Sequence, residues 1–165
     1  MGGTVGRVVS VNISGGKGTS KKAVAEGRFR CDVGLVGDAH AGPGIRQVSL
    51  LAAESIARQQ EVLESRRQEG KCPKAHGEDF NLRPGSFAEN LTIEGIDLAH
   101  LPIGTKLKIG GEVEMEITKI GKECHVGCEI FKMLGNCIMP REGVFSRVLS
   151  EGTVRPGDEV VVECE

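Results

Sequence analysis

Glycine is the residue that most restricts what this chain can fold into. It accounts for 24 of the 165 residues, about twice the share in an average protein, and 6 prolines add further breaking positions. Glycine or proline inside a helix costs stability relative to alanine. Long helices are therefore disfavoured, and short strands joined by tight turns are favoured. The sequence predicts a mainly β fold.

Alternating apolar and polar residues indicate where these strands lie. The clearest case is 113–120, where Val113, Met115 and Ile117 alternate with acidic and polar side chains. The other segments predicted as strands are 5–14, 23–29, 90–93, 106–109, 144–149 and 159–164. Because the chain contains no internal repeat, we expect residues 1–165 to form a single domain around a closed or nearly closed β-barrel.

Only one segment has the pattern of a long helix, residues 50–68. Ser49 is the predicted N-cap and Gly70 suits the C-terminal cap. A short helix is predicted over 124–134, and residues 153–159 are predicted as a turn that enters the last strand. The expected architecture is thus a β-barrel with one long helix and a few short ones.

Charge and composition exclude several classes of partner. The net charge is −2, so no overall basic field attracts DNA, RNA or an anionic membrane. With no Trp or Tyr and only 5 Phe, the chain lacks an aromatic platform on which bases stack. The longest apolar stretches, 8–11 and 45–53, are too short to span a bilayer, and the first residues do not resemble a signal peptide. We expect a cytoplasmic protein without nucleic-acid or membrane partners.

Six cysteines are many for a reducing compartment, where structural disulfides are rare. Cys124, Cys128 and Cys137 lie close in sequence to Lys122 and His125, both of which favour the reactive thiolate. On a helix, Cys124 and Cys128 would share one face. Three interpretations stay open: a reactive thiol that carries sulfur or ligates a soft metal, a zinc site, and buried cysteines that act as small hydrophobes. The remaining cysteines fit the last class: Cys31, Cys72 and Cys164.

A glycine-rich segment, 37–44, is followed by Arg46 and contains Asp38 and His40. Glycine-permitted turns beside an arginine can cradle a phosphate. An ordinary surface loop explains the same residues equally well.

Two further polar segments offer candidate ligand-binding residues. Ser86, Glu89 and Asn90 come immediately before a predicted strand, where they face a cleft or satisfy the amides of a turn. Arg141 and Arg147 suit a phosphate or carboxylate ligand, or are surface charges.

The order of these segments resembles the MOSC domain, a family named after the C-terminal region of molybdenum cofactor sulfurases. The resemblance covers about residues 5–162 and is strongest to the short, stand-alone bacterial type. It rests on Gly37-Asp38-x-His40-x-Gly42 with Arg46-Gln47, Phe87-x-Glu89-Asn90-Leu91, Ile103-Gly104 with the strand to Ile120, Cys124, and Arg147-Val148-Leu149 with Gly157-Asp158.

The resemblance implies a barrel with a cysteine in its cleft, and Cys124 is the residue that matches. It implies that Cys124 accepts or passes sulfane sulfur as a persulfide, or ligates molybdenum bound to molybdopterin. Lys122 and His125 would assist it, and Cys128 could resolve the persulfide by thiol exchange. The residues expected to line the cofactor cleft are Asp38, His40, Arg46, Asn90 and Arg147.

The implied cofactor is therefore the molybdenum cofactor, held transiently. No pyridoxal phosphate is expected, because the chain lacks an aminotransferase-like desulfurase domain. The implied partners are a cysteine desulfurase or another sulfur donor, and proteins that build or use the cofactor. Two alternatives stay open: a small molybdenum-dependent reductase of N-hydroxylated compounds, and a structural zinc-binding module.

Overall fold

The computed structural model describes residues 4–16, 20–68, 82–121 and 138–163. Strands dominate these residues, in agreement with the glycine content. The elements in chain order are β1 (Val5–Ile13), β2 (Lys22–Val24), β3 (Gly27–Arg30), β4 (Gly34–Leu35), β5 (Val48–Ala52), α1 (Ala53–Gln68), β6 (Leu91–Glu94), η2 (Leu98–His100), β7 (Lys106–Ile109), β8 (Val113–Ile120), α3 (Met139–Glu142), β9 (Val144–Ser150), β10 (Gly152–Val154) and β11 (Glu159–Glu163).

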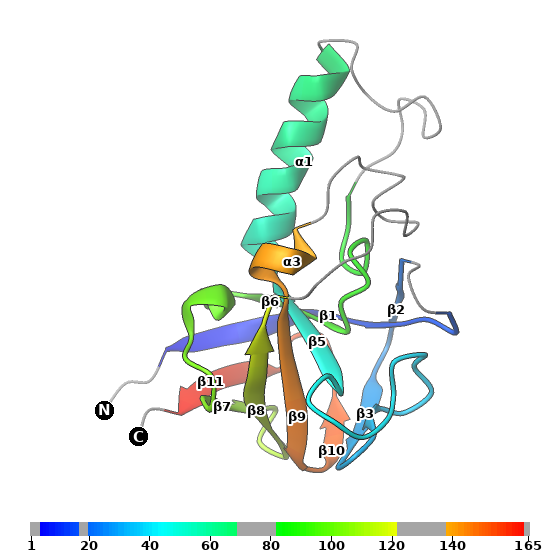
Figure 1. Ribbon diagram of the computed structural model, residues 1–165, viewed down its shortest axis with the longest axis vertical. Helices are drawn as coiled ribbons and strands as arrows, with labels where there is room; N and C mark the ends of the chain where they lie inside the picture. The colour runs from blue at the N-terminus through cyan, green and yellow to red at the C-terminus, as the bar shows by residue number, and fades with distance from the viewer. Residues whose placement is uncertain (1–3, 17–19, 69–81, 122–137, 164–165) are drawn as a thin grey trace.

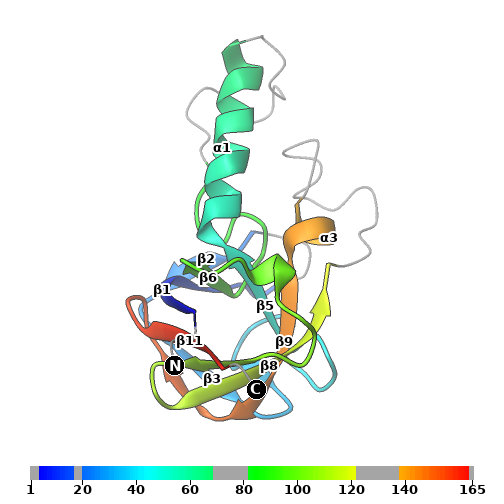
Figure 2. The ribbon, with the colours of Figure 1, turned by 90° about the vertical axis from the view of Figure 1, so that its left-hand side faces the viewer.

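Seven strands close into a barrel, which confirms the predicted fold class. The sheet runs β11-β7-β8-β9-β5-β6-β1, and pairing of β11 with β1 closes the ring, while β2 extends β1 on the outside. Figure 2 shows the ring of strands with α1 rising away from it. β5 and β6 are parallel, and the other strand pairs of the described residues are antiparallel. A parallel pair needs a long crossover connection, which α1 and the segment before β6 supply (Figure 1).

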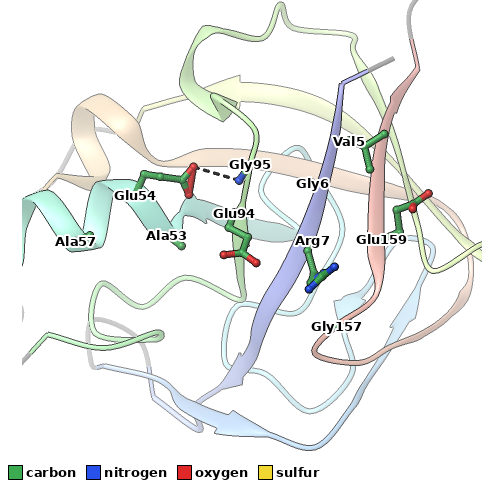
Figure 3. A pocket seen from close by; sticks show the side chains of 10 residues that line it. All are labelled: Val5, Gly6, Arg7, Ala53, Glu54, Ala57, Glu94, Gly95, Gly157 and Glu159. Carbon is green, nitrogen blue, oxygen red and sulfur yellow. Dashed lines mark hydrogen bonds between the residues drawn. The ribbon is translucent and has the colours of Figure 1, made fainter. Parts of the chain in front are cut away.

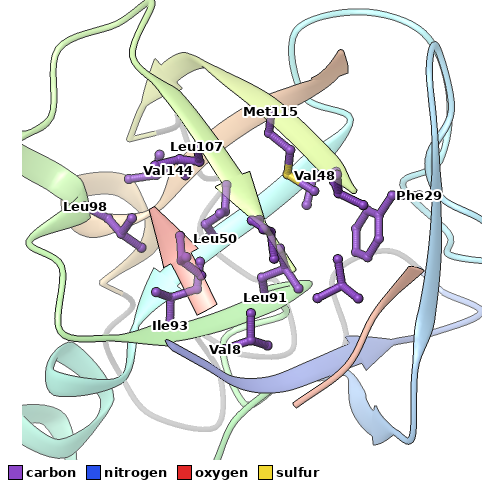
Figure 4. Close-up of a cluster of buried hydrophobic side chains, with 14 of the residues drawn as sticks. Val8, Phe29, Val48, Leu50, Leu91, Ile93, Leu98, Leu107, Met115 and Val144 are labelled. Carbon is purple, nitrogen blue, oxygen red and sulfur yellow. The ribbon is translucent and has the colours of Figure 1, made fainter. Parts of the chain in front are cut away.

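Aliphatic side chains fill the barrel. The alternation predicted for 113–120 is observed in β8, where Val113, Met115 and Ile117 are fully buried in the core cluster. Leu50, Val144 and their neighbours meet them from the facing strands (Figure 4). With no Trp or Tyr available, this core buries only one aromatic ring, Phe29, among the described residues.

A second apolar cluster lies on the outer face of the barrel. It is formed by Leu51, Ile56, Phe87, Ala88, Ile138, Met139 and Phe145. Leu51 and Phe145 alternate along their strands with Leu50 and Val144, which face the core, so one pair of strands serves both clusters.

The predicted start of the long helix is wrong. Residues 48–52 form the fully buried strand β5, and α1 begins only at Ala53. Ser49 is therefore not an N-cap. The segment pairs with β6 on one side and β9 on the other, and a strand buried on both faces has a continuous apolar pattern that periodicity cannot separate from a helix.

Two other predicted boundaries also change. The strand expected over 23–29 is divided into β2 and β3, and the first two residues of the turn expected over 153–159 belong to β10. β10 pairs with β3, which also pairs with β4, and these strands form a small separate sheet. The predicted helix at 124–134 lies outside the described residues. Within the described ranges, no helix has the length and apolarity needed to cross a membrane.

Candidate functional site

A buried ion pair joins the glycine-rich segment to the residues before β2. Lys21 Nζ lies 2.7 Å from Asp38 Oδ1, and the two side chains are 0% and 1% exposed. Lys21 Nζ also lies 3.1 Å from Ser14 Oγ and 3.1 Å from His40 Nδ1. An ammonium group has three protons to donate, so the three contacts use its full donor capacity.

Asp38 is surrounded by hydrogen-bond donors. The backbone N–H of Ser14 donates to Oδ1 and the backbone N–H of His40 donates to Oδ2. Burial alone would raise the pKa of Asp38, but its side-chain contacts with His40 and Lys21, and those from Ser14 and Asn90, outweigh burial and lower the pKa well below its ordinary value. Asp38 is therefore a carboxylate at neutral pH.

His40 lies at the exposed side of this pair, with 36% of its side chain accessible. Its Nδ1 is 3.1 Å from Lys21 Nζ and 3.7 Å from Asp38 Oδ2, so Lys21 is the hydrogen-bond partner and the approach to Asp38 is electrostatic only. Because Nδ1 accepts from Lys21, we assign the proton of the neutral ring to Nε2. Among the residues that the structure describes, no partner accepts from this Nε2–H, so it is available to donate to a ligand.

Asn90 completes the group from the barrel side. Its Oδ1 accepts from the Ser49 N–H at 3.0 Å, and its Nδ2 lies 3.3 Å from Asn12 O. The same amide also contributes to the lowered pKa of Asp38. Lys21, Asp38, His40 and Asn90 are called the Lys21–Asp38 cluster below. The structure thus brings together three of the predicted residues, Asp38, His40 and Asn90, on the outer face of the barrel.

Glu89 lies behind this cluster and is fully buried. Its carboxyl accepts hydrogen bonds from the N–H groups of Gly85 and Phe87 and from the Thr92 hydroxyl, at 3.0, 3.3 and 2.7 Å. Burial disfavours the charged form and raises the pKa of Glu89, although these hydrogen bonds oppose the shift. Of the two predicted roles for this segment, Glu89 takes the one that satisfies turn amides.

The two arginines expected to line the cofactor cleft, Arg46 and Arg147, have different surroundings. The Arg46 guanidinium lies 5.7 Å from the ring centroid of Phe145, and it has no carboxylate partner within the described ranges. Arg147 points to the outside of β9 and pairs with Glu116, 3.3 Å from each carboxylate oxygen. Phe145 is the cross-strand partner of Ser49, which binds Asn90. Arg46 is therefore on the same outer face as the Lys21–Asp38 cluster and has no ion-pair partner among the described residues, whereas Arg147 is paired with Glu116.

The predicted thiol residues Lys122, Cys124, His125 and Cys128 lie outside the described residues. The described residues before this segment end at Gly121, whose N–H donates to Gly143 O. They resume at Ile138, which packs in the outer cluster with Phe87 and Ala88, and Ala88 O accepts from Ser49 Oγ. Ile138, the first described residue after this segment, therefore lies beside Ala88, which is hydrogen-bonded to Ser49. Ser49 in turn binds the side chain of Asn90. Among the described residues, no group of three His, Cys, Asp or Glu side chains could hold a metal.

The central cation of the site, Lys21, was not predicted from the sequence. Lys21 follows a short polar segment and is adjacent to a second lysine, and nothing local marks it as buried. Lysine is almost never fully buried unless it is paired, and its partner is 17 positions away. The only available signal was the need of a buried Asp38 for a counterion, which does not identify the residue.

An open pocket of the described residues lies elsewhere. It has a volume of about 730 Å³ and is lined by Arg7, Glu54, Glu94 and Glu159 together with glycines and alanines at the base of α1 (Figure 3). None of the predicted site residues lines it. Three of its lining residues are glycines, Gly6, Gly95 and Gly157.

Comparison with known proteins supports the fold over nearly the whole chain. YuaD from Bacillus subtilis superposes with a TM-score of 0.70 at 16% identity, covering 98% of this chain and 97% of that one. YiiM from Geobacillus stearothermophilus gives 0.63 at 17% identity, covering 96% and 75%. YiiM from Escherichia coli gives 0.63 at 15% identity, covering 96% and 70%.

No curated protein matches the sequence significantly. The solved structures are all below 25% identity, so they establish the fold and not the activity. The family assignment comes from a sequence model instead. That model, described as the MOSC domain, matches residues 37–161, which is most of the chain, and this protein therefore belongs to the MOSC domain family.

Proposed function

We propose that this protein handles the molybdenum cofactor and carries sulfane sulfur on Cys124. Membership of the MOSC domain family connects it with the molybdenum cofactor in general terms. That Cys124 carries sulfur is a more specific proposal than a general role with the cofactor. The observation that supports it is the position of the Lys21–Asp38 cluster. The cluster lies on the side of the barrel where the described chain resumes at Ile138, after the segment that contains Cys124.

The polar groups around the cluster fit a phosphate-bearing pterin. Lys21 is saturated by its three partners, so it fixes the cluster and does not bind the ligand itself. His40 offers Nε2–H and Arg46 offers a guanidinium on the same face. Both groups donate hydrogen bonds to phosphate oxygens. We assign Arg46 and His40 to holding molybdopterin, which when bound supplies a molybdenum atom that a thiolate can ligate.

The sulfur transfer is balanced without an external oxidant. The Cys124 thiolate attacks the terminal sulfur of a donor persulfide, a new S–S bond forms, and the old S–S bond breaks. The donor cysteine leaves as a thiolate, and the transferred sulfur keeps its proton. The donor would be a cysteine desulfurase or a similar carrier, and the acceptor a protein that builds or uses the cofactor.

Sulfur loading of the reduced protein tests this proposal. Anaerobic incubation with a cysteine desulfurase and cysteine should add the mass of one sulfur atom, and peptide mapping should locate it on Cys124. Cys124→Ser should abolish this adduct, because serine forms no persulfide. Cys31 was predicted to be a buried small hydrophobe, and this prediction is wrong because its side chain is exposed. Cys31→Ser is therefore the control, since it removes an exposed thiol and should load like the wild type.

Equal loading of the wild type and the Cys124→Ser variant would exclude the carrier role. Metal analysis of protein made in a molybdenum-replete host separates the alternatives. Retained molybdenum would favour the reductase, and stoichiometric zinc lost on replacement of Cys124 and Cys128 would favour a structural module.

The arginines give a second prediction. Arg46→Ala should weaken binding of molybdopterin by about tenfold, the equivalent of one charge-assisted hydrogen bond. Arg147→Ala should change the Kd less than about twofold, since the charge of Arg147 is already paired with Glu116. Anaerobic titration with cofactor released from a molybdoenzyme measures both constants. Equal losses in the two variants would contradict the assignment.

A further inference from the structure

We infer that Glu89 is a positioning residue for the Lys21–Asp38 cluster. It acts through the turn 83–88 and through residues of the neighbouring strands, since its hydrogen bonds among the described residues go to Gly85, Phe87 and Thr92. The inference rests on the proposed function only in treating this cluster as the part of the molecule that faces a ligand.

Glu89 is a carboxyl group with no cationic partner among the described residues. It is fully buried, and its hydrogen bonds come from two backbone N–H groups and one hydroxyl. A buried carboxyl group lowers stability relative to an apolar residue unless hydrogen bonds within the protein replace those it made with water. Its two oxygens accept from different amides, Gly85 to Oε2 and Phe87 to Oε1, so the carboxyl fixes the turn at two points.

The first connection runs from this turn to Lys21. The Lys21 backbone N–H donates to Gly85 O at 2.8 Å, and the Ser20 hydroxyl donates to Ser86 O at 3.0 Å. A Cβ built on Gly85 would collide with the Lys21 carbonyl. The turn and the Lys21 backbone are therefore in direct contact, and a shift of the turn moves the root of the Lys21 side chain.

The second connection runs from Glu89 to Asn90. Thr92 Oγ1 donates to Glu89 and accepts from Asn12 Nδ2 at 3.1 Å, while Asn12 Nδ2 also lies 3.1 Å from Glu89 O. The Asn12 carbonyl in turn accepts from the Asn90 amide at 3.3 Å. All of these groups are buried. Displacement of the Glu89 carboxyl would therefore disturb both the cation and the amide that stabilise Asp38.

The side chain needs two acceptor oxygens to do this. Glutamine has nearly the same shape but only one oxygen, so Glu89→Gln leaves one turn amide without its acceptor. Leucine would leave both amides unpaired in a buried place, at a cost that threatens folding. Glu89→Gln is therefore the more informative variant.

The tautomer of His40 reports the geometry of the cluster without any ligand. In the wild type, ¹⁵N NMR should show Nδ1 as an unprotonated acceptor and Nε2 as the protonated nitrogen, because Lys21 donates to Nδ1. In folded Glu89→Gln, the Nδ1 signal should shift toward the protonated position as Lys21 moves away. Thr92→Val, which breaks only the second connection, should produce a smaller shift in the same direction.

Glu94→Gln is the matched control, since Glu94 is an exposed carboxylate at the end of β6, which begins two residues after Glu89; its spectrum should equal that of the wild type. An unchanged His40 spectrum in folded Glu89→Gln, with only a lower unfolding midpoint, would show that Glu89 is a structural brace and overturn the inference. If Glu89→Gln does not fold, Thr92→Val decides alone: a shifted His40 signal supports the inference and an unchanged one overturns it. Because no ligand is present, these outcomes are independent of sulfur loading on Cys124.

Discussion

Lys21→Met should destabilise the protein by about 3–5 kcal/mol, as expected when one partner of a buried ion pair is removed. The variant leaves the Asp38 carboxylate in a site where its side chain is 1% exposed, without the cation 2.7 Å away. The hydrogen bonds from Ser14 and His40 remain, but they do not neutralise the charge. Urea unfolding at neutral pH measures the loss.

The neighbouring residue provides the control. Lys22 is exposed on β2, so Lys22→Met should change the free energy of unfolding by less than about 0.5 kcal/mol. Asp38→Asn should be costly as well, and the double variant Lys21→Met/Asp38→Asn should cost clearly less than the sum of the two single losses, because it leaves no unpaired charge. Additive losses would show that the two groups are not coupled.

The same pair determines how stability responds to acid. The pKa of Asp38 is lowered in the folded state, so its contribution is present above the pKa of the unfolded chain and is lost as the pH falls toward the folded value. The pKa of Glu89 is raised, so its contribution has the opposite sign: it is present at low pH and lost as the pH rises through the folded pKa. The stability difference between wild type and Asp38→Asn isolates Asp38, and it should shrink below about pH 4. A difference that is constant with pH would contradict the lowered pKa.

Gly85→Ala should have a comparably large effect, a loss of about 2–5 kcal/mol, since two costs combine. Gly85 has φ +91°, a conformation that costs an L-residue roughly 1–2 kcal/mol. The added Cβ would also overlap the Lys21 carbonyl, and overpacking of this kind costs about 1–3 kcal/mol. Thermal unfolding measures the total.

Gly104→Ala separates the two costs. Gly104 has φ +96° but nothing lies within 4 Å of its added Cβ. This variant should therefore lose only the conformational part, about 1–2 kcal/mol. Equal losses at the two positions would mean that the turn yields to the extra methyl group, and that its contact with Lys21 is loose.

Several elements could be predicted because their pattern is local. β7 and β8 have the bounds expected from alternation, and β1, β6, β9 and β11 differ from their predicted bounds by only a residue or two. Of these strands, β7, β8 and β11 alternate between buried residues and more exposed ones, so their own sequence records the two faces. β5 has no exposed face and was predicted as helix, because its partners β6 and β9 are distant in sequence.

The residues of the candidate site also divide into those that could be predicted from the sequence and those that could not. Asp38, His40 and Asn90 were predicted from short motifs, and the structure places all three in one cluster. The sequence did not show which of Arg46 and Arg147 is more available to a ligand. The pairing of Arg147 with Glu116 depends on the register of β8 against β9. Lys21 was missed because its burial results from contacts with Ser14, Asp38 and His40 and not from any property of its neighbours.

By itself, the sequence determined the fold class, the MOSC resemblance and the choice of Cys124 as the thiol to test. Glycine content, strand alternation and ordered motifs are local signals that need no knowledge of neighbours in space. The tertiary structure decided which polar residues meet, that Lys21 is the cation of the cluster, and that Ser49 and Glu89 hold the strands and the turn around it. The physical reason is that burial of charge and completion of hydrogen bonds are properties of residues far apart in the chain, and only folding brings them together.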